Sequence, residues 1–129
     1  MKVVRETDLV KQLLQWLKLR GIDAWRQNAG AMAGEYKGKR RFLRFAGVEG
    51  ISDIIGLVSV NVMPLPFGTQ AGPMTIARFL AIEAKMPGNK PTEKQIAFLE
   101  MVRRAGGIGL VVYSLADLES GLRDEGVIR

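Results

Sequence analysis

Apolar side chains recur along this chain at two spacings, and the wider spacing predicts three helices. Residues 6–19 place an apolar side chain at every third or fourth position, which is the period of a helix with one buried face. A second helix is predicted over 92–105, with Thr92 at the N-cap, and a third over 115–122, after Ser114. We therefore expect one helix at the start of the chain and two in its last third.

The segments between these helices predict strands, because they are short, apolar and bounded by turn residues. The predicted strands span residues 24–28, 51–60, 78–85 and 108–113. Residues 29–47, with four glycines around a basic run, predict a hairpin or a flap, and residues 63–75, with three prolines, predict a loop or an extended β-excursion. This order predicts an α/β fold, a mixed β-sheet flanked by helices, in a single domain over 1–129.

The sequence contains no cysteine and no histidine. Their absence excludes disulfides, zinc ribbons, thiol catalysis, Ser-His-Asp triads and imidazole metal sites. Any chemistry must therefore come from carboxylates, lysines and a hard metal ion that prefers oxygen ligands. We expect no organic cofactor.

Positive charge is concentrated in the first part of the chain. Residues 1–45 contain 11 Lys and Arg against 4 Asp and Glu, a net charge of +7, whereas residues 46–129 contain 8 against 9, a net charge of −1. The excess of positive charge in residues 1–45 favours a polyanionic partner, because binding to phosphates releases their counterions. A protein with a basic surface and no such partner explains the charge equally well. No stretch of about 20 apolar residues predicts a membrane span, and the N-terminus lacks the apolar core of a signal peptide, so we expect a cytoplasmic protein with no membrane partner.

Residues 82–85 read Ile-Glu-Ala-Lys at the end of a predicted strand. Since side chains in a strand alternate between its two faces, Glu83 and Lys85 point the same way, away from the layer that their neighbours enter. A carboxylate and an ammonium at the end of an apolar strand are costly to bury without a purpose. A surface ion pair on a half-exposed strand is the alternative.

Asp53 is the only charged residue over 50–77, and it lies within a predicted apolar strand. It either caps the turn at which the strand begins or points into a site. If its strand neighbours that of Glu83, the two carboxylates can converge on one divalent cation. Two carboxylates, waters and a backbone carbonyl, which we assign to Ala84, suit Mg²⁺ or Mn²⁺. Lys85 can then position or deprotonate an attacking water and balance the charge of the transition state.

Two further residues fit such a site. Glu6 lies on the core-facing stripe of the first predicted helix, where it either compensates the helix dipole or reaches the metal as a third carboxylate. Gln95 is explained by a capping box with Thr92. It also lies on the apolar face of its helix, ten residues after Lys85, where it can border the site.

The ordered set of these residues resembles the VRR-NUC branch of the PD-(D/E)XK nuclease superfamily. The resemblance is carried by Glu6 in the first helix, Gly50-x-x-Asp53, Glu83-Ala84-Lys85, and Gln95-x-x-Phe98 at the start of the next helix. It continues through Gly106-Gly107 into an apolar strand and covers nearly the whole chain apart from 61–77. Ser52 stands where the superfamily name has Pro, at a turn position that bears no chemistry.

The resemblance implies a restriction-endonuclease-like fold with an α-β-β-β-α-β core and hydrolysis of phosphodiester bonds with Mg²⁺ or Mn²⁺. It implies that Asp53 and Glu83 are metal ligands and that Lys85 is the catalytic lysine. It also implies that Glu6 and Gln95 are accessory residues of the site. Stand-alone proteins of this branch are typical of phages and bacteria, resemble Holliday-junction resolvases and tend to be homodimers that act on branched DNA. We therefore expect a homodimer in a bacterial or phage-infected cell and a substrate such as a four-way junction.

The basic run within residues 37–44, with aromatic residues interleaved, is a candidate DNA-contacting element. Its cationic residues are Lys37, Lys39, Arg40, Arg41 and Arg44, and Lys90 and Lys94 lie near the site in sequence. A solvated hairpin with a basic face is the alternative. No zinc finger or clear helix-turn-helix indicates base readout, so recognition of DNA structure is favoured over recognition of sequence. The apolar residues 62–74 are a candidate dimer interface or a lid.

The leading interpretation is a structure-selective DNA endonuclease. A nuclease of the same fold that acts on flaps, free ends or restriction sites is the alternative among enzymes. A non-catalytic nucleic-acid-binding module is the alternative from another class, and the presence of Asp53, Glu83 and Lys85 together argues against it. A small α/β interaction domain, whose acids all serve as caps and surface pairs, explains each residue singly but not their joint order.

Overall fold

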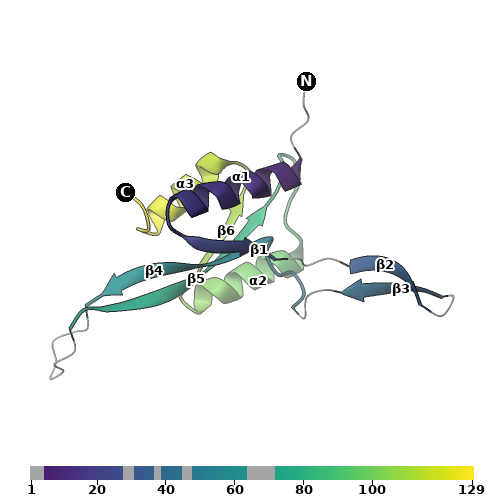
Figure 1. The fold of residues 1–129 in the computed structure, drawn as a ribbon, viewed down its shortest axis with the longest axis horizontal. Coiled ribbons are helices and arrows are strands. Elements are labelled where there is room, and N and C mark those ends of the chain that lie inside the picture. Colours follow the sequence, from purple (N-terminus) through teal and green to yellow (C-terminus); the bar gives the residue numbers. More distant parts are fainter. Residues whose placement is uncertain (1–4, 28–30, 37–38, 45–47, 64–71) are drawn as a thin grey trace.

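The computed structural model describes residues 5–27, 31–36, 39–44, 48–63 and 72–129, with the backbone alone described for 31–36 and 39–44. Within these residues the chain forms three helices and six strands (Figure 1). The helices are α1 (Glu6–Leu19), α2 (Glu93–Arg104) and α3 (Leu115–Asp124). The strands are β1 (Asp23–Arg26), β2 (Ala31–Tyr36), β3 (Lys39–Arg44), β4 (Ile54–Val62), β5 (Met74–Ala84) and β6 (Ile108–Val112). None of these helices is long and apolar enough to cross a membrane.

Four of the strands form one mixed sheet in the order β1-β4-β5-β6. β4 pairs antiparallel with both β1 and β5, whereas β5 and β6 run parallel, because α2 carries the chain back along the sheet between them. α1 and α3 pack on one face of the sheet, and α2 packs on the other (Figure 1). The predicted α/β architecture, a mixed sheet flanked by helices, is confirmed.

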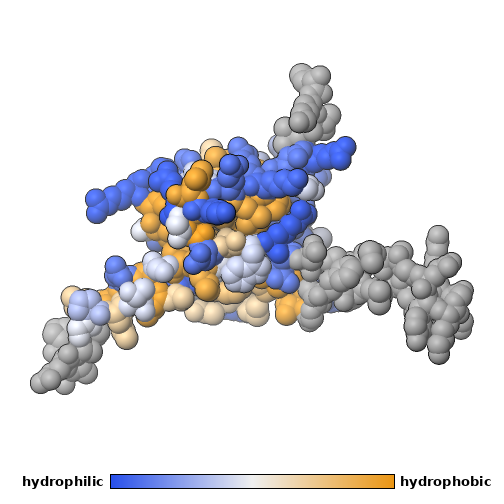
Figure 2. All heavy atoms as spheres, in the orientation of Figure 1, coloured by the Kyte–Doolittle hydropathy of each residue, from blue (hydrophilic) through white to orange (hydrophobic). Residues whose placement is uncertain are grey.

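Each face of the sheet carries its own apolar core. The larger core lies beneath α1 and α3, where residues at helical spacing on α1 are buried against alternate residues of the strands. The smaller core lies beneath α2 and consists of Ala81, Phe98, Leu99 and Val102. In Figure 2 hydrophilic residues spread over the helices above the sheet, and apolar colour shows between them and along the sheet below. Because alternate residues of β5 enter the two cores, Glu83 falls on the side of Ala81 and α2.

β4 and β5 form a long antiparallel hairpin, paired from Ile54 with Ile82 to Val62 with Met74. The strand predicted over 51–60 therefore begins and ends later than expected. The strand predicted over 78–85 begins four residues earlier than expected and ends at Ala84.

Of the three prolines that indicated a loop, Pro73 is the one within the described residues, and it does not interrupt this hairpin. Pro73 comes just before the first residue of β5, so the position at which it lacks an N–H is outside the backbone ladder. Near the same end, Thr75 Oγ1 donates to Asn61 Oδ1 at 3.0 Å across the two strands. The candidate interface or lid over 62–74 falls largely on residues 64–71, which lie outside the described residues.

The hairpin predicted within 29–47 is confirmed. β2 and β3 pair antiparallel from Ala31 with Arg44 to Tyr36 with Lys39, as a two-stranded sheet of their own. Lys37 and the side chains of the other predicted DNA-contacting residues in this segment lie outside what the structure describes. Their contact with DNA stays a prediction.

Candidate active site

Glu83 lies near the end of β5 with its side chain on the face that α2 covers. Its neighbours Ile82 and Ala84 point the other way and are fully buried beneath α1 and α3. Glu83 itself is only 1% exposed. A surface ion pair therefore does not describe this residue, because its carboxyl group is removed from water.

The sequence predicted Asp53 to lie within a strand. In the structure it lies at the bend just before β4. Its Oδ2 accepts a hydrogen bond from the backbone N–H of Ala84 at 3.0 Å, and its own carbonyl accepts one from Gln27 at 2.7 Å. The regular ladder with β5 starts one residue later, because the Asp53 side chain takes up the N–H that a backbone carbonyl would otherwise accept. Asp53 therefore has the predicted turn role, and its carboxyl group also lies close enough to Glu83 to raise the pKa of that residue; its role in a functional site stays a prediction.

The turn that carries Asp53 packs directly on the first turn of α2. Gly50 has a φ of +76°, and a Cβ at this position would overlap the carbonyl group of Lys94 and lie 2.8 Å from the nitrogen of Gln95. Glycine is required here both for its backbone conformation and for the space. The Gly50-x-x-Asp53 spacing therefore sets the turn on the helix and brings the carboxylate to the end of β5.

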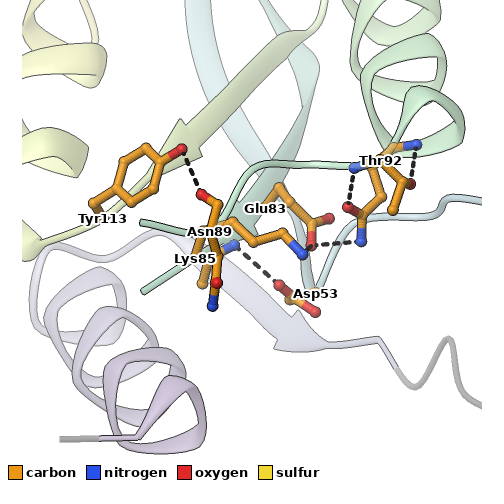
Figure 3. A network of polar contacts seen from close by, with 8 residues as sticks. Asp53, Glu83, Lys85, Asn89, Thr92 and Tyr113 are labelled. Atoms are coloured by element: carbon orange, nitrogen blue, oxygen red, sulfur yellow. Dashed lines mark hydrogen bonds and ion pairs between the residues drawn. The ribbon is translucent and has the colours of Figure 1, made fainter. Parts of the chain in front are cut away.

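Gln95 joins the start of α2 to the buried carboxylate. Thr92 Oγ1 accepts the backbone N–H of Gln95 at 3.2 Å, and Gln95 Oε1 accepts the backbone N–H of Thr92 at 2.8 Å, so the predicted capping box is confirmed. Gln95 Nε2 also donates to Glu83 Oε1 at 3.0 Å (Figure 3). One side chain therefore caps the helix and holds one oxygen of Glu83.

Lys85 follows β5 directly, and its ammonium lies 3.7 Å from Glu83 Oε1. Its backbone N–H donates to the carbonyl of Val112 on β6 at 2.9 Å. Because the N–H and C=O of one peptide group point in opposite directions, the carbonyl of Ala84 points to the other side of β5, where Asp53 lies. Lys85 and the Ala84 carbonyl thus flank the two carboxylates.

The pKa of Glu83 is raised from 4.5 to about 8, first by burial of its carboxyl group and then by the charge of the nearby Asp53 carboxyl and its hydrogen bonding with Glu83. Lys85 acts in the opposite direction, and Glu6 adds a small further increase. Glu83 Oε2 is buried and has no hydrogen-bond partner within the described part of the chain. A buried carboxyl group beside a like charge is typical of functional sites.

The oxygen atoms at this point suit a hard divalent cation. They belong to Asp53, to Glu83 Oε2 and to the Ala84 carbonyl, and carboxylate and carbonyl oxygens are the ligands that Mg²⁺ and Mn²⁺ prefer. A cation would remove the repulsion between the carboxylates and give Oε2 the partner that it lacks. No group of three acidic side chains able to hold an ion occurs among the residues described, so the carbonyl and water are needed to complete the ligand set.

Glu6 lies in the first turn of α1 together with Asp8, as expected for acids that compensate a helix dipole. Its charge reaches Glu83, but it does not form a three-carboxylate group with Asp53 and Glu83 in the described structure. The role of Glu6 as a direct metal ligand stays a prediction.

Two lysines predicted to contact DNA lie in the segment that joins Lys85 to Gln95. Lys90 is exposed in the loop between β5 and α2, and Lys94 is exposed in the first turn of α2. Lys94 Nζ lies 2.8 Å from a carboxylate oxygen of Glu49. Their exposure leaves both ammonium groups accessible to a phosphate backbone.

Sequence analysis missed two features of this region. Tyr113 donates its hydroxyl to the carbonyl of Asn89 at 3.0 Å and so ties the loop after Lys85 to the end of β6 (Figure 3). Ser52 is completely buried, and its hydroxyl has no hydrogen-bond partner among the residues that the structure describes. Tyr113 belongs to no motif, and Ser52 was noted in the sequence only as a turn residue in place of Pro, with nothing to indicate that its hydroxyl would be buried.

Comparison with known proteins gave no match to this chain among family models, curated proteins or solved structures. Its function is therefore inferred from the side chains that the fold gathers at the end of β5.

Proposed function

We propose that this protein is a metal-dependent nuclease that hydrolyses phosphodiester bonds of DNA, with Asp53, Glu83 and Lys85 at its centre. The observation that carries the proposal is the pair of carboxylates at the end of β5, of which Glu83 is almost completely buried with an unpartnered Oε2. Two neighbouring acids in an apolar setting destabilise the fold unless a cation compensates them. The resemblance to the VRR-NUC branch supports the same assignment and a restriction-endonuclease-like sheet.

Mg²⁺ or Mn²⁺ held by Asp53, Glu83 and the Ala84 carbonyl would supply Lewis-acid chemistry, neutralising charge on the scissile phosphate and activating the attacking water. The protein fixes one oxygen of each acid, since Ala84 N–H holds Asp53 Oδ2 and Gln95 holds Glu83 Oε1. The remaining oxygens are the ones available to a cation. Fixed ligands of this kind require little rearrangement during the reaction.

Lys85 supplies the positive charge of the proposed centre. Its side chain is 15% exposed, against 1% for Glu83, so the ammonium lies between the buried carboxylate and the solvent from which a substrate arrives. From this place Nζ can donate a hydrogen bond to a phosphate oxygen or to the attacking water and balance the charge of the transition state.

DNA is the proposed substrate because the chain is rich in cationic residues before the site and carries two exposed lysines next to it in sequence. Lys90 and Lys94 lie between Lys85 and Gln95, and residues 1–45 carry a net charge of +7, from 11 Lys and Arg against 4 Asp and Glu. The resemblance further suggests branched DNA, such as a four-way junction, and a homodimer that presents two sites to two strands. A bacterial or phage-infected cell is the setting that the same resemblance suggests.

Cleavage of defined DNA substrates tests this proposal. A labelled four-way junction, a flap and a linear duplex are each incubated with the protein in Mg²⁺, Mn²⁺ or EDTA, beside Lys85→Ala. Cleavage in either metal, lost in EDTA and in the variant, is expected, with the junction cut fastest. Binding to the junction without cleavage in any metal would favour a binding module, and cleavage that persists in EDTA would contradict the mechanism.

A further inference from the structure

Thr92, the N-cap of α2, is connected to the buried carboxylate through a single side chain. The backbone N–H of Thr92 donates to Gln95 Oε1 at 2.8 Å, and Gln95 Nε2 donates to Glu83 Oε1 at 3.0 Å (Figure 3). Thr92 Oγ1 holds the other side of the cap by accepting the Gln95 backbone N–H at 3.2 Å. Both ends of the Gln95 amide are therefore engaged.

The direction of this amide is determined by Thr92. A backbone N–H can only donate, so it must face the amide oxygen, and the amide nitrogen is then directed to Glu83. Rotating the amide by half a turn would bring two donors together at Thr92 and two acceptors together at Glu83. Because the first N–H groups of a helix have no partner within the helix, Thr92 has no competing backbone acceptor there.

The same arrangement decides which oxygen of Glu83 is available. Gln95 Nε2 and Lys85 Nζ both approach Oε1, at 3.0 and 3.7 Å, whereas Oε2 is buried without a partner among the described residues. With its other oxygen held, the carboxylate has little freedom to rotate. Oε2 is thereby left as the oxygen that faces a cation shared with Asp53.

We propose that Thr92 is a positioning residue of the metal site: its backbone N–H orients the Gln95 amide, which holds Glu83 Oε1 and leaves Oε2 to bind the ion. This inference rests on the proposed function, since it assigns a role to Thr92 at the same site. Residues that orient metal ligands typically change metal affinity by about 10- to 100-fold when they are replaced.

Two substitutions at Thr92 separate helix capping from positioning. Thr92→Ala removes the hydroxyl but keeps the N–H, whereas Thr92→Pro removes both, and the φ of −71° at this residue is one that proline adopts. Ser114→Ala is the matched control, because Ser114 caps α3 by accepting the Asp117 N–H, also at 3.2 Å. It removes a cap of the same kind in a helix that takes no part in the site.

The first readout is the affinity of the DNA-free protein for Mn²⁺, measured by titration calorimetry. We expect Thr92→Pro to weaken binding at least about 10-fold relative to Thr92→Ala, with Ser114→Ala unchanged from wild type. Equal affinities for Thr92→Pro and Thr92→Ala would overturn the inference while leaving the metal site in place. If wild-type protein binds no Mn²⁺, the proposed metal site and this inference both fail.

A second readout uses wild-type protein without metal and does not depend on how any variant folds. A scalar coupling through the hydrogen bond, from the Thr92 backbone nitrogen to the side-chain carbonyl carbon of Gln95, is expected in the NMR spectrum. The Gln95 side-chain amide protons should also exchange with solvent more slowly than those of Gln12, which is exposed on α1. Absence of the coupling together with rapid exchange would contradict the proposed orientation.

Discussion

Asp53 and Glu83 stand opposite one another, one step beyond the last regular pair of the β4–β5 ladder, Ile54 with Ile82. Here the Asp53 side chain accepts the N–H of Ala84, while the Asp53 carbonyl accepts the N–H of Gln27. The end of a β-ladder therefore brings two acids together on one side of the sheet. This juxtaposition is the basis of the predictions that follow.

Neutralising either acid should stop cleavage without preventing DNA binding. Asp53→Asn keeps an oxygen that can accept the Ala84 N–H, and Glu83→Gln keeps one for Gln95, so both variants retain the local contacts. We expect cleavage to fall by at least about two to three orders of magnitude and junction affinity in EDTA to stay within about twofold, as measured by gel assays. Wild-type turnover in either variant would refute the assignment.

Removing the ammonium of Lys85 should impair the chemical step and spare metal binding. Lys85→Met keeps much of the apolar stem but cannot balance charge at the phosphate. Single-turnover cleavage should slow by roughly 10²- to 10⁴-fold, while the Mn²⁺ affinity stays close to that of wild type or rises, because one competing cation is gone. A variant that cleaves normally would exclude Lys85 from the reaction.

Stability of the metal-free protein should fall as the pH rises from about 4.5 to about 8. The pKa of Glu83 is raised in the folded state to about 8 from 4.5, so across this interval the folded protein binds a proton that the unfolded chain releases. The free energy of unfolding therefore decreases, by up to about 1.4 kcal/mol per pH unit for one proton. Urea unfolding in EDTA at several pH values measures this slope.

Glu83→Gln is the control for this pH dependence. It removes the titrating group, so its slope over the same interval should be flatter than that of wild type and its stability at pH 8 should be higher. Adding Mn²⁺ should raise the stability of wild-type protein at pH 8 far more than that of the variant. A wild-type stability that is constant or rises between pH 5 and 8 in EDTA would contradict the burial of an unpartnered carboxyl group.

Adding a methyl group at Gly50 should damage the site more than the same change elsewhere. Gly21 has nearly the same φ, +74° against +76°, but its Cβ would meet nothing within 4 Å. Gly21→Ala should cost about 1–2 kcal/mol of unfolding free energy from backbone strain alone. Gly50→Ala should cost more and also weaken Mn²⁺ binding, since the new methyl group overlaps the first turn of α2. Equal losses and equal Mn²⁺ affinity in both variants would show that the turn does not depend on this contact.

Lys94 should contribute to DNA affinity without contributing much to stability. Its ion pair with Glu49 is exposed, at 66% and 51% for the two side chains, and exposed pairs contribute less than about 1 kcal/mol. Lys94→Ala should weaken junction binding and reduce the slope of log affinity against log salt concentration by about 1. Lys11→Ala, an exposed lysine on α1 across the sheet, is the matched control and should leave this slope unchanged. Equal salt slopes for the two variants would remove Lys94 from the DNA contact surface.

The sequence by itself determined the secondary structure and its order. Periodicity and capping residues located α1, α2 and α3 to within a few residues, because a helix with one buried face repeats a pattern that is visible locally. Strand ends were less accurate. β5 starts at Met74 because β4 and β5 stay paired past the residues at which β1 and β6 pair with them. The start of β5 is therefore set by its partner strand and not by the residues of β5 alone.

Tertiary structure alone decided what the polar residues near these elements do. Asp53 was predicted to lie within a strand, but it precedes β4, and its side chain accepts the backbone N–H of Ala84 at the end of the β4–β5 pairing. Gln95 had a complete local explanation as a cap, but its second hydrogen bond reaches Glu83, twelve positions away. The environment that raises the pKa of Glu83 is created only when β4, β5 and α2 pack together, since burial and the approach of like charges depend on distances in space. The sequence identified Asp53, Glu83 and Gln95 as candidates by residue type and spacing. Their proximity in space depends on tertiary contacts that no local pattern encodes.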